Sequence, residues 1–338
     1  MTLSFRTDLV ALLRGYFACP VIAGLDDLGL VKRMLSGPFT AADLPVANRS
    51  AMHAALLYLQ SLGLVEAGAG DAFQTTTAGK YVFERAGAFH LLRSYRDYFA
   101  DFASLLSSSE RSAAVRRLEN IGGTGQLHAR KYFPSALRKL AGRKIQCVVD
   151  VGCGDGEFLA TVLQEHPSAK AIGVDLSTEA VEMTQQRLGD RVRGVVADGS
   201  SVLDWAGAIP NGGIGAVVSV WFVLHEFARG VAELVIKFLH EMHAAAPRAE
   251  LIVGEIVALP ADGLSTARGE SVYPELLLFH ALSGQGVLSW EQHREWIGCV
   301  PYKVASEERF DEVSMVNGSV PSSVVWHLIP IEQITRPD

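Results

Sequence analysis

The sequence predicts an α/β protein built on a doubly wound parallel sheet, with a mainly helical region in front of it. Between residues 144 and 255, short apolar runs alternate with amphipathic helical patterns. The apolar run at 147–151 stops at three alternating glycines, Gly152, Gly154 and Gly156, and a helical pattern follows at once. Residues 1 to about 140 contain almost only helical patterns. These observations place the strand-to-helix turn at 152–156 at the centre of the fold.

Composition indicates a globular protein with a sizeable core. The chain has 338 residues, of which 49% are hydrophobic, and this length accommodates two domains of ordinary size. The formal net charge of −7 does not favour a nucleic-acid partner. Four cysteines, Cys19, Cys147, Cys153 and Cys299, lack the spacing of a metal site. We expect them to be reduced, in a cytoplasmic protein.

The N-terminal apolar residues predict an amphipathic helix and not a signal peptide, because Asp8 and Arg14 interrupt them. No uninterrupted apolar run reaches the ~18 residues of a membrane span, so no membrane association is expected.

A winged-helix pattern is predicted within residues 1–100. Helical patterns lie at 4–17, 21–25, 28–36 and 50–62, with a short helix at 40–45 capped by Thr40. Residues 64–66 and 73–77 predict a small β-hairpin. DNA binding is one function of such a pattern, but residues 50–62 contain no Lys or Arg. We therefore interpret this region as a dimerisation and substrate-lid domain.

Residues 101–140 are predicted to be connecting helices that complete the lid. Just before and within them, Tyr95, Tyr98, Phe99 and Phe102 form one aromatic helix face. This face is either core packing or one wall of a substrate pocket.

The sheet elements are predicted in chain order. Strands are expected at 147–151, 171–174, 192–197, 216–220 and 251–255, with helices between them, for example at 178–188 and 231–245. A helix at 270–282 follows, and Ser289 begins another, with Gln292 completing a capping box. Two antiparallel strands are expected at the end, one from residue 310 and one at 322–330.

The chemistry of the glycine turn distinguishes two kinds of ligand. A dinucleotide site has G-x-G-x-x-G spacing, but here the spacing is G-x-G-x-G, with Asp150, Asp155 and Glu157 around it. Carboxylates repel phosphate and suit a cationic ligand. The segment VVDVGCGDG resembles motif I of the class I S-adenosylmethionine-dependent methyltransferases. The resemblance implies a Rossmann-like, seven-stranded domain over residues 141–338; the alternative is an ordinary strand-to-helix turn.

Residues after the predicted strands fit the same resemblance. Asp175 and Leu176 follow the second strand, about 20 residues after the glycines, where a carboxylate suits a ribose diol. Asp198 and Gly199 follow the third strand and resemble the adenine-contacting corner of the family. Each could instead be a helix cap. The resemblance assigns the cofactor S-adenosyl-L-methionine to Asp150, Gly152, Gly154, Asp175, Leu176, Asp198, Gly199 and Ser219.

The segment after the fourth strand resembles the "VLHDW" segment of small-molecule O-methyltransferases that carry a winged-helix dimerisation domain. Here it is Val223-Leu224-His225-Glu226-Phe227. In many of those enzymes this histidine is the general base that deprotonates a hydroxyl.

A second histidine, His280, lies in the apolar run 276–280. A lone histidine in such a run is more often a core residue, but this one falls on the helix that closes over the acceptor pocket in these enzymes. His225 and His280 would then form a pair of imidazole metal ligands, for iron or zinc. A histidine followed by an acid, with a second histidine some fifty residues later, resembles the α-keto acid C-methyltransferases of nonproteinogenic amino acid and antibiotic biosynthesis.

That resemblance implies methylation of C3 of a 2-oxo acid through a metal-stabilised enolate. Glu226 would orient the water that removes the proton or support a metal ligand. Arg111 would bind the substrate carboxylate, with Arg116 and Arg117 as alternatives. The acceptor would be a 5-guanidino-2-oxopentanoate paired with Asp97 or Asp101, or a phenylpyruvate packed on the aromatic face. Acidic residues interleave that face, which favours the guanidino acceptor.

Two other functions are compatible with parts of the sequence. A metal-independent O-methyltransferase would use His225 as base, oriented by Glu255 or Glu226. A non-catalytic regulator that senses S-adenosylmethionine would need a basic recognition helix, which residues 50–62 do not provide. We expect a homodimer that acts on a small molecule, without a nucleic-acid or membrane partner.

Overall fold

The computed structural model describes residues 5–100, 102–107, 125–228, 231–260, 273–315 and 318–331. The chain divides into two compact units, Met1–Arg96 and Asp97–Asp338, each with its own set of internal contacts. The two units are described separately.

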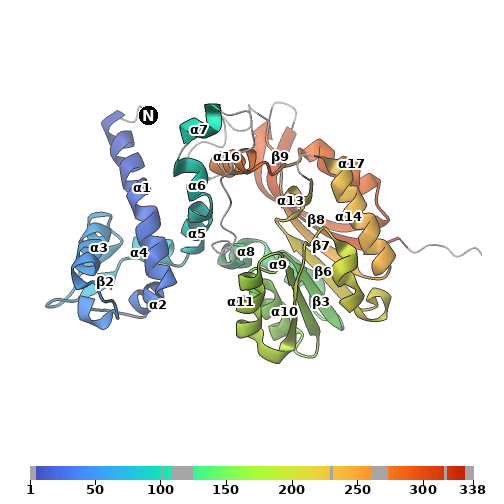
Figure 1. Ribbon diagram of the computed structural model, residues 1–338, viewed down its shortest axis with the longest axis horizontal. Coiled ribbons are helices and arrows are strands. Elements are labelled where there is room, and N and C mark those ends of the chain that lie inside the picture. The colour runs from blue at the N-terminus through green and yellow to red at the C-terminus, as the bar shows by residue number, and fades with distance from the viewer. Residues whose placement is uncertain are drawn as a thin grey trace, which may run out of the picture. The chain divides into compact units, whose positions relative to one another are not determined.

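The N-terminal unit is mainly helical and has one small hairpin (Figure 1). Its elements are α1 (Phe5–Asp27), α2 (Leu30–Leu35), a 3₁₀ turn (Ala41–Asp43), α3 (Arg49–Ser61), β1 (Val65–Ala67), β2 (Phe73–Thr75), α4 (Thr77–Phe83) and α5 (Gly87–Ser94). β1 and β2 pair antiparallel, as the sequence predicted. Thr40 accepts a hydrogen bond from the backbone N–H of Asp43 and so caps the 3₁₀ turn, which confirms the predicted cap.

The prediction of two separate helices at 4–17 and 21–25 was wrong, because α1 continues through Pro20. Proline lacks one N–H and normally ends or kinks a helix. Here burial of Ile22, Ala23 and Leu25 stabilises the turn that follows it. By length and composition alone, the segment Leu9–Asp27 of this helix could cross a membrane, and 17% of its apolar stretch is buried. A single helix of this kind near the N-terminus does not establish a membrane span.

The second unit is built on a seven-stranded sheet in the order β5-β4-β3-β6-β7-β9-β8. The strands are β3 (Cys147–Val151), β4 (Lys170–Asp175), β5 (Val192–Val196), β6 (Ala216–Trp221), β7 (Glu250–Ile256), β8 (Tyr302–Met315) and β9 (Gly318–Pro330). The first five are parallel, whereas β9 is antiparallel to both β7 and β8. The chain reverses direction across the sheet between β3 and β6, and ligands of such sheets bind at this switch point.

Helices cover both faces of this sheet (Figure 1). One face packs against α9 (Phe133–Leu140) and α10 (Glu157–Glu165), through residues such as Phe133 and Phe158. The other packs against α12 (Val202–Trp205), α14 (Ala232–Ala245) and α17 (Trp290–Gly298). β3 and β6 are buried along their whole length. Coverage of both faces is the reason that these strands are continuous apolar runs in the sequence.

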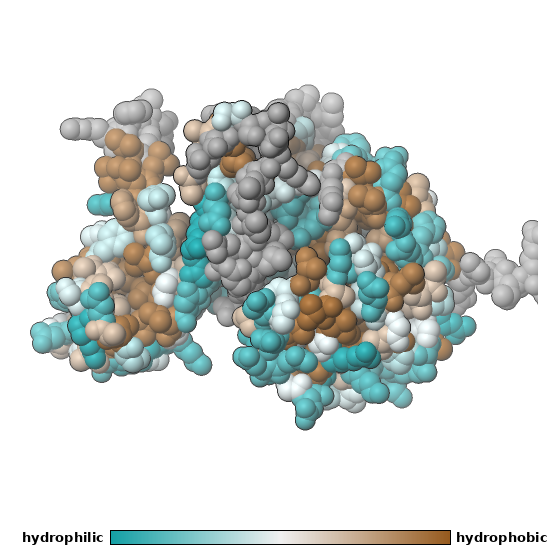
Figure 2. Space-filling view, viewed as in Figure 1, coloured by the Kyte–Doolittle hydropathy of each residue, from teal (hydrophilic) through white to brown (hydrophobic). Residues whose placement is uncertain are grey.

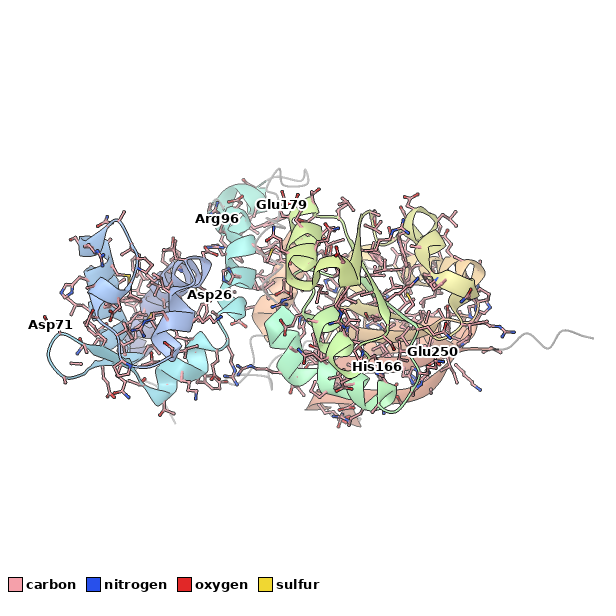
Figure 3. All side chains as sticks on the ribbon, turned by 90° about the horizontal axis from the view of Figure 1, so that it is seen from below. Asp26, Asp71, Arg96, His166, Glu179 and Glu250 are labelled. Carbon is pink, nitrogen blue, oxygen red and sulfur yellow. The ribbon has the colours of Figure 1, made fainter. Side chains whose placement is uncertain are left out.

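α11 (Thr178–Leu188) packs on β4 and β5. The remaining described helices are α6 (Arg96–Ala100), α7 (Phe102–Ser107), α8 (Gly125–Lys131), α13 (Leu224–Ala228) and α16 (Tyr273–Ser283). Figure 3 shows the two ends of the parallel strands. Glu179, at the start of α11, lies at the carboxyl end, and His166 and Glu250, which precede or begin strands, lie at the amino end. The carboxyl ends of the parallel strands meet at the edge where α11 begins.

The last two strands begin earlier than predicted, at Tyr302 and Gly318 instead of 310 and 322. β8 lies at the edge of the sheet, so much of it faces solvent and carries charged residues. Glu308, for example, accepts hydrogen bonds from Ser135 and Arg138 of α9. These charges interrupt the apolar alternation by which a strand is recognised in a sequence.

Candidate active site

The glycine turn follows β3 with three residues in the left-handed region. The φ angles are 77° at Gly152, 53° at Gly154 and 74° at Gly156, which residues with a Cβ rarely adopt. A Cβ on Gly152 would also lie 2.5 Å from Cγ2 of Val223. The turn therefore requires glycine both for its backbone angles and for the close approach of the segment after β6.

Asp150 and Ser219 form a buried pair beneath this turn. They are neighbours in register on β3 and β6, and the Ser219 hydroxyl donates to Oδ1 of Asp150 over 2.7 Å. Burial, together with the nearby Asp175 and Asp155, raises the pKa of Asp150 to about 8. Ser219 is fully buried. Its hydroxyl is hydrogen-bonded to Asp150, and its predicted contact with the cofactor stays a prediction.

The other predicted cofactor residues lie at the same edge of the sheet. Asp175 ends β4, and its carboxylate accepts hydrogen bonds from the backbone N–H groups of Gly154 and Ser177, at 3.0 and 2.9 Å. Leu176, next to it, is 61% exposed. Asp198 accepts hydrogen bonds from Ser200 as a local cap. These residues follow the neighbouring strands β4 and β5 at the carboxyl end of the sheet.

Two of the three carboxylates around the turn form ion pairs with the same arginine. Arg187 of α11 lies 2.7 Å from Glu157 and 3.4 Å from Asp155, and it also donates to the backbone carbonyl of Asp155. Asp155 and Glu157 thus hold the turn against α11. Asp150, the third acid that the sequence offered to a cationic ligand, is bonded by Ser219 instead.

His225 is held by a glutamate from the next strand. Its Nδ1 lies 2.8 Å from Oε1 of Glu255, and its backbone N–H donates to Oε2 over 3.0 Å. The N–H of Ile256 also donates to this carboxylate. Glu255 is 1% exposed; burial would raise its pKa, but the adjacent His225 imidazole and these hydrogen bonds hold it below the ordinary value. An ionised Glu255 fixes the proton of His225 on Nδ1.

Glu255 and Glu226 were the two acids predicted to orient His225, and the structure assigns the direct contact to Glu255. Glu226 lies next to His225 in α13 and is partly exposed. Glu255, thirty residues away in the sequence, is the carboxylate that contacts the ring. The reason is geometric: successive helical residues point in different directions, whereas β6 and β7 are adjacent and end at the same edge.

His280 faces His225 from α16, and the two Nε2 atoms are 3.1 Å apart. The rings are nearly perpendicular, at 87°, and both side chains are buried. Nδ1 of His280 contacts the carbonyl oxygen of Leu276, which can only accept, so that this nitrogen carries the proton. With both Nδ1 atoms protonated, two Nε2 lone pairs face each other. This arrangement favours a third species between them, either a proton or a cation.

A third buried histidine supports the first pair and had no assigned role in the sequence. His293 of α17 contacts the carbonyl oxygen of Ile256 through Nε2 and accepts a hydrogen bond from Trp296 at Nδ1. Burial lowers its pKa to about 4. A neutral His293 anchors the end of β7 next to Glu255. The only signal in the sequence was its place in the capped helix, which says nothing of this contact.

The metal ligands were predicted as His225 and His280, and the structure brings these two together. Among the described residues, no group of three or more His, Cys, Asp or Glu side chains is arranged to hold a metal ion. Arg111, Arg116 and Arg117, predicted to bind a substrate carboxylate, and Asp101 lie outside the described residues.

Part of the predicted aromatic face lies against the helix that carries His280. Phe99 of α6 makes an edge-to-face contact with Phe279, with ring centroids 5.8 Å apart, and it stacks on Phe102 at 6.3 Å. Phe279 precedes His280 in the chain. The aromatic residues 99 and 102 therefore lie beside α16.

The fold and this edge together define a class I S-adenosylmethionine-dependent methyltransferase. Residues 148–245, from β3 to the end of α14, match the family model described as "Methyltransferase domain". Over 39 residues the chain is 46% identical to "Methyltransferase ungE'" of Aspergillus campestris (strain IBT 28561), a match that spans 12% of this chain and 11% of that protein.

Solved structures extend the likeness to almost the whole chain. The mitomycin 7-O-methyltransferase MmcR has a TM-score of 0.61 and 16% identity, covering 96% of this chain and 97% of that one. An O-methyltransferase family protein from Burkholderia thailandensis has a TM-score of 0.58, 18% identity and coverage of 97% and 99%. CalO1, a methyltransferase in calicheamicin biosynthesis, was solved with S-adenosylhomocysteine and has a TM-score of 0.57, 16% identity and coverage of 97% and 100%. At these identities the likeness shows the fold alone.

Proposed function

We propose that this protein transfers the methyl group of S-adenosylmethionine to a hydroxyl oxygen of a small natural-product acceptor, with His225 as general base. The observation that carries the proposal is the buried His225–Glu255 pair, which leaves Nε2 of His225 as the basic nitrogen. The small-molecule methyltransferases with the same fold support an acceptor of this size.

The steps follow from the geometry of these residues. Nε2 of His225 takes the hydroxyl proton, and Glu255 stabilises the resulting imidazolium through Nδ1. The acceptor oxygen attacks the methyl carbon as the carbon–sulfur bond breaks, so that the methylated acceptor and S-adenosylhomocysteine are formed. The protein mainly holds the two reactants in line.

The test is transfer of radiolabelled methyl groups to a panel of hydroxylated aromatic compounds, with 4-nitrocatechol as the defined probe. We expect kcat of His225→Asn to fall by about 10²–10⁴-fold, the range for loss of a general base. The kcat of Glu255→Gln should fall by a similar factor, because an amide N–H₂ group facing Nδ1 of His225 favours the tautomer with its proton on Nε2. The exposed His53→Gln is the control. Full activity of His225→Asn would refute the proposal.

The pair of facing Nε2 atoms favours a second candidate, metal-assisted methylation at C3 of a 2-oxo acid. With their Nε2 atoms 3.1 Å apart, His225 and His280 would hold an iron or zinc ion as two imidazole ligands. A bound metal ion would supply Lewis acidity at the keto oxygen. The Phe99 and Phe279 rings support an aryl acceptor such as phenylpyruvate.

Elemental analysis separates the two candidates. Metal-assisted chemistry requires near-stoichiometric iron or zinc in the wild type, its loss in His280→Ala, and its retention in the control His240→Ala on α14. It also requires methylation of phenylpyruvate or 5-guanidino-2-oxopentanoate. A protein that is active without metal and unaffected by chelators would exclude this candidate and leave the hydroxyl acceptor.

A further inference from the structure

His128 of α8 lies beside the site, and neither candidate mechanism uses it. The helix that carries it packs closely against the glycine turn. A Cβ on Gly125, at the start of α8, would lie 2.7 Å from Oδ1 of Asp155 and 2.9 Å from Cβ of Glu157. α8 is thus in contact with the cofactor edge of the sheet, and His128 follows one turn after Gly125.

The His128 ring packs on the segment that leads to His225. Its centroid is 4.4 Å from that of Phe222, with the rings inclined by only 31°, and 6.0 Å from that of Tyr132. Phe222 follows the last residue of β6 and has a φ of 56°, a conformation that aromatic residues rarely adopt. Its backbone N–H donates to the carbonyl of Gly254, which precedes Glu255. Strain of this kind persists where the surroundings enforce it, as at functional sites.

The nitrogens of His128 differ from those of the other histidines at this edge. Nδ1 and Nε2 of His225, His280 and His293 all have contacts to named atoms. Within the described part of the chain, neither nitrogen of His128 has a hydrogen bond, and the residue is partly exposed. The faces of the ring are packed against aromatic neighbours, whereas its nitrogens are available to bond a ligand.

The charge state of this imidazole suits a neutral or anionic oxygen. Burial lowers the pKa of His128 to about 4, and the Glu255 carboxylate opposes this shift because it lies within electrostatic reach. At neutral pH the ring is uncharged and offers one N–H donor and one acceptor nitrogen.

We propose that His128 contacts the methyl acceptor and positions it, donating its N–H to an oxygen of a planar, oxygen-bearing aryl compound that packs beside Phe222. This inference rests on the proposed function, because it requires a small methyl acceptor at this end of the sheet. It is the same whether the methylated atom is a hydroxyl oxygen or C3 of a 2-oxo acid. His128 is a positioning residue, and the proton transfer stays with His225.

The experiment compares two variants of the full chain. His128→Phe keeps the aromatic packing and removes the donor, whereas His128→Asn keeps a donor. We expect His128→Phe to raise KM for the acceptor about 10–100-fold, with kcat and the Kd of S-adenosylhomocysteine within about twofold of wild type, as loss of a binding interaction does. His128→Asn should recover most of this loss. His240→Phe, on the far helix α14, is the control.

A binding measurement keeps the test independent of catalysis. Protein labelled at histidine is saturated with S-adenosylhomocysteine and titrated with 4-nitrocatechol or phenylpyruvate, and the imidazole resonances are followed by NMR. The His128 signal, assigned by its loss in His128→Phe, should shift with the probe, also in the inactive His225→Asn.

Three results would overturn the inference. One is an unshifted His128 signal when either probe binds. Another is weaker S-adenosylhomocysteine binding in both His128 variants, which would place the contact on the cofactor. The last is an unchanged KM in a stable, folded His128→Phe. Failure of the proposed function would look different. The variant His225→Asn would then remain active, while His128→Phe would still raise KM for the acceptor.

Discussion

Asp150 is a buried carboxyl group at the end of β3 whose pKa lies near 8, because burial and the neighbouring Asp175 and Asp155 disfavour its charge. It is therefore largely protonated at neutral pH in the ligand-free protein. S-adenosylmethionine carries a sulfonium and an ammonium group, which favour the ionised carboxylate and lower this pKa in the complex. Cofactor binding should release a proton.

The sign of the pH dependence follows from this release. Because the free protein binds the proton and the complex does not, affinity for S-adenosylmethionine should rise as the pH rises to about 8 and then level off. Calorimetry in buffers with different ionisation enthalpies measures the proton released. In Asp150→Asn the release should disappear, and a wild-type protein that released none would contradict the assignment.

Gly152 gives a second prediction at the residue scale. Gly152→Ala places a Cβ 2.5 Å from Val223 at a φ of 77°, so that the turn must shift. We expect S-adenosylhomocysteine to bind about 5- to 150-fold more weakly, since strain of this kind costs of order 1–3 kcal/mol. Gly207→Ala is the matched control, because a Cβ there meets nothing within 4 Å. Equal affinities for the two variants, measured by calorimetry, would argue against a tight turn.

At the scale of elements, α17 connects the C-terminal part of the chain to the end of β7. Ser289 and Gln292 cap the helix reciprocally, which confirms the predicted capping box. His293 then bonds the carbonyl of Ile256 and packs against Trp326 of β9. Docking of this helix thus depends on a histidine that must stay neutral.

The stability of the fold should therefore decrease in acid through His293. Its pKa is about 4 in the folded protein, below the ordinary value near 6.5, so that only the unfolded chain takes up this proton between pH 6.5 and 4. Its contribution is complete above pH 6.5 and lost as the pH falls, by about 3 kcal/mol in all. Urea unfolding at pH 7 and 5 should show a smaller pH difference for His293→Gln than for wild type or the exposed His53→Gln. An identical change in the free energy of unfolding between pH 7 and 5 in all three proteins would disprove the role of His293.

At the scale of the whole molecule, α1 carries a group of exposed apolar side chains. Figure 2 shows apolar residues along this helix, and Leu9, Val10, Leu12, Leu13, Tyr16 and Phe17 are each 46–76% exposed. Contiguous apolar surface of this kind marks an interaction site. We propose that a second copy of the chain covers it, in the homodimer that the sequence predicted.

Light scattering after size exclusion tests this oligomer. We expect a dimer for the wild type and a monomer for Leu12→Glu/Tyr16→Glu, because two buried charges cost several kcal/mol at an interface. Leu203→Glu, a change at an equally exposed leucine on α12, should stay dimeric. A wild type that is monomeric but sediments with phospholipid vesicles would show instead that α1 meets a membrane.

The methyltransferase class and the cofactor edge could be read from the sequence because they depend on local patterns. The glycine spacing, the apolar strands and the acids that follow them are short-range features, and β-sheet burial on both faces makes those strands continuous apolar runs. The edge strand β8 was placed too late because its charged residues face solvent, and α1 was divided because the rule for proline is local.

The partners of the reactive groups depended on contacts between distant residues. The sequence by itself determined the sheet, the glycine turn and the two histidines of interest. Only the tertiary structure decided that Glu255, and not the adjacent Glu226, holds His225, that Arg187 neutralises two of the acids around the turn, and that His128 lies at the same edge. The physical reason is that the sheet and the helices packed around it bring together residues that are far apart in the chain, above all where parallel strands end side by side.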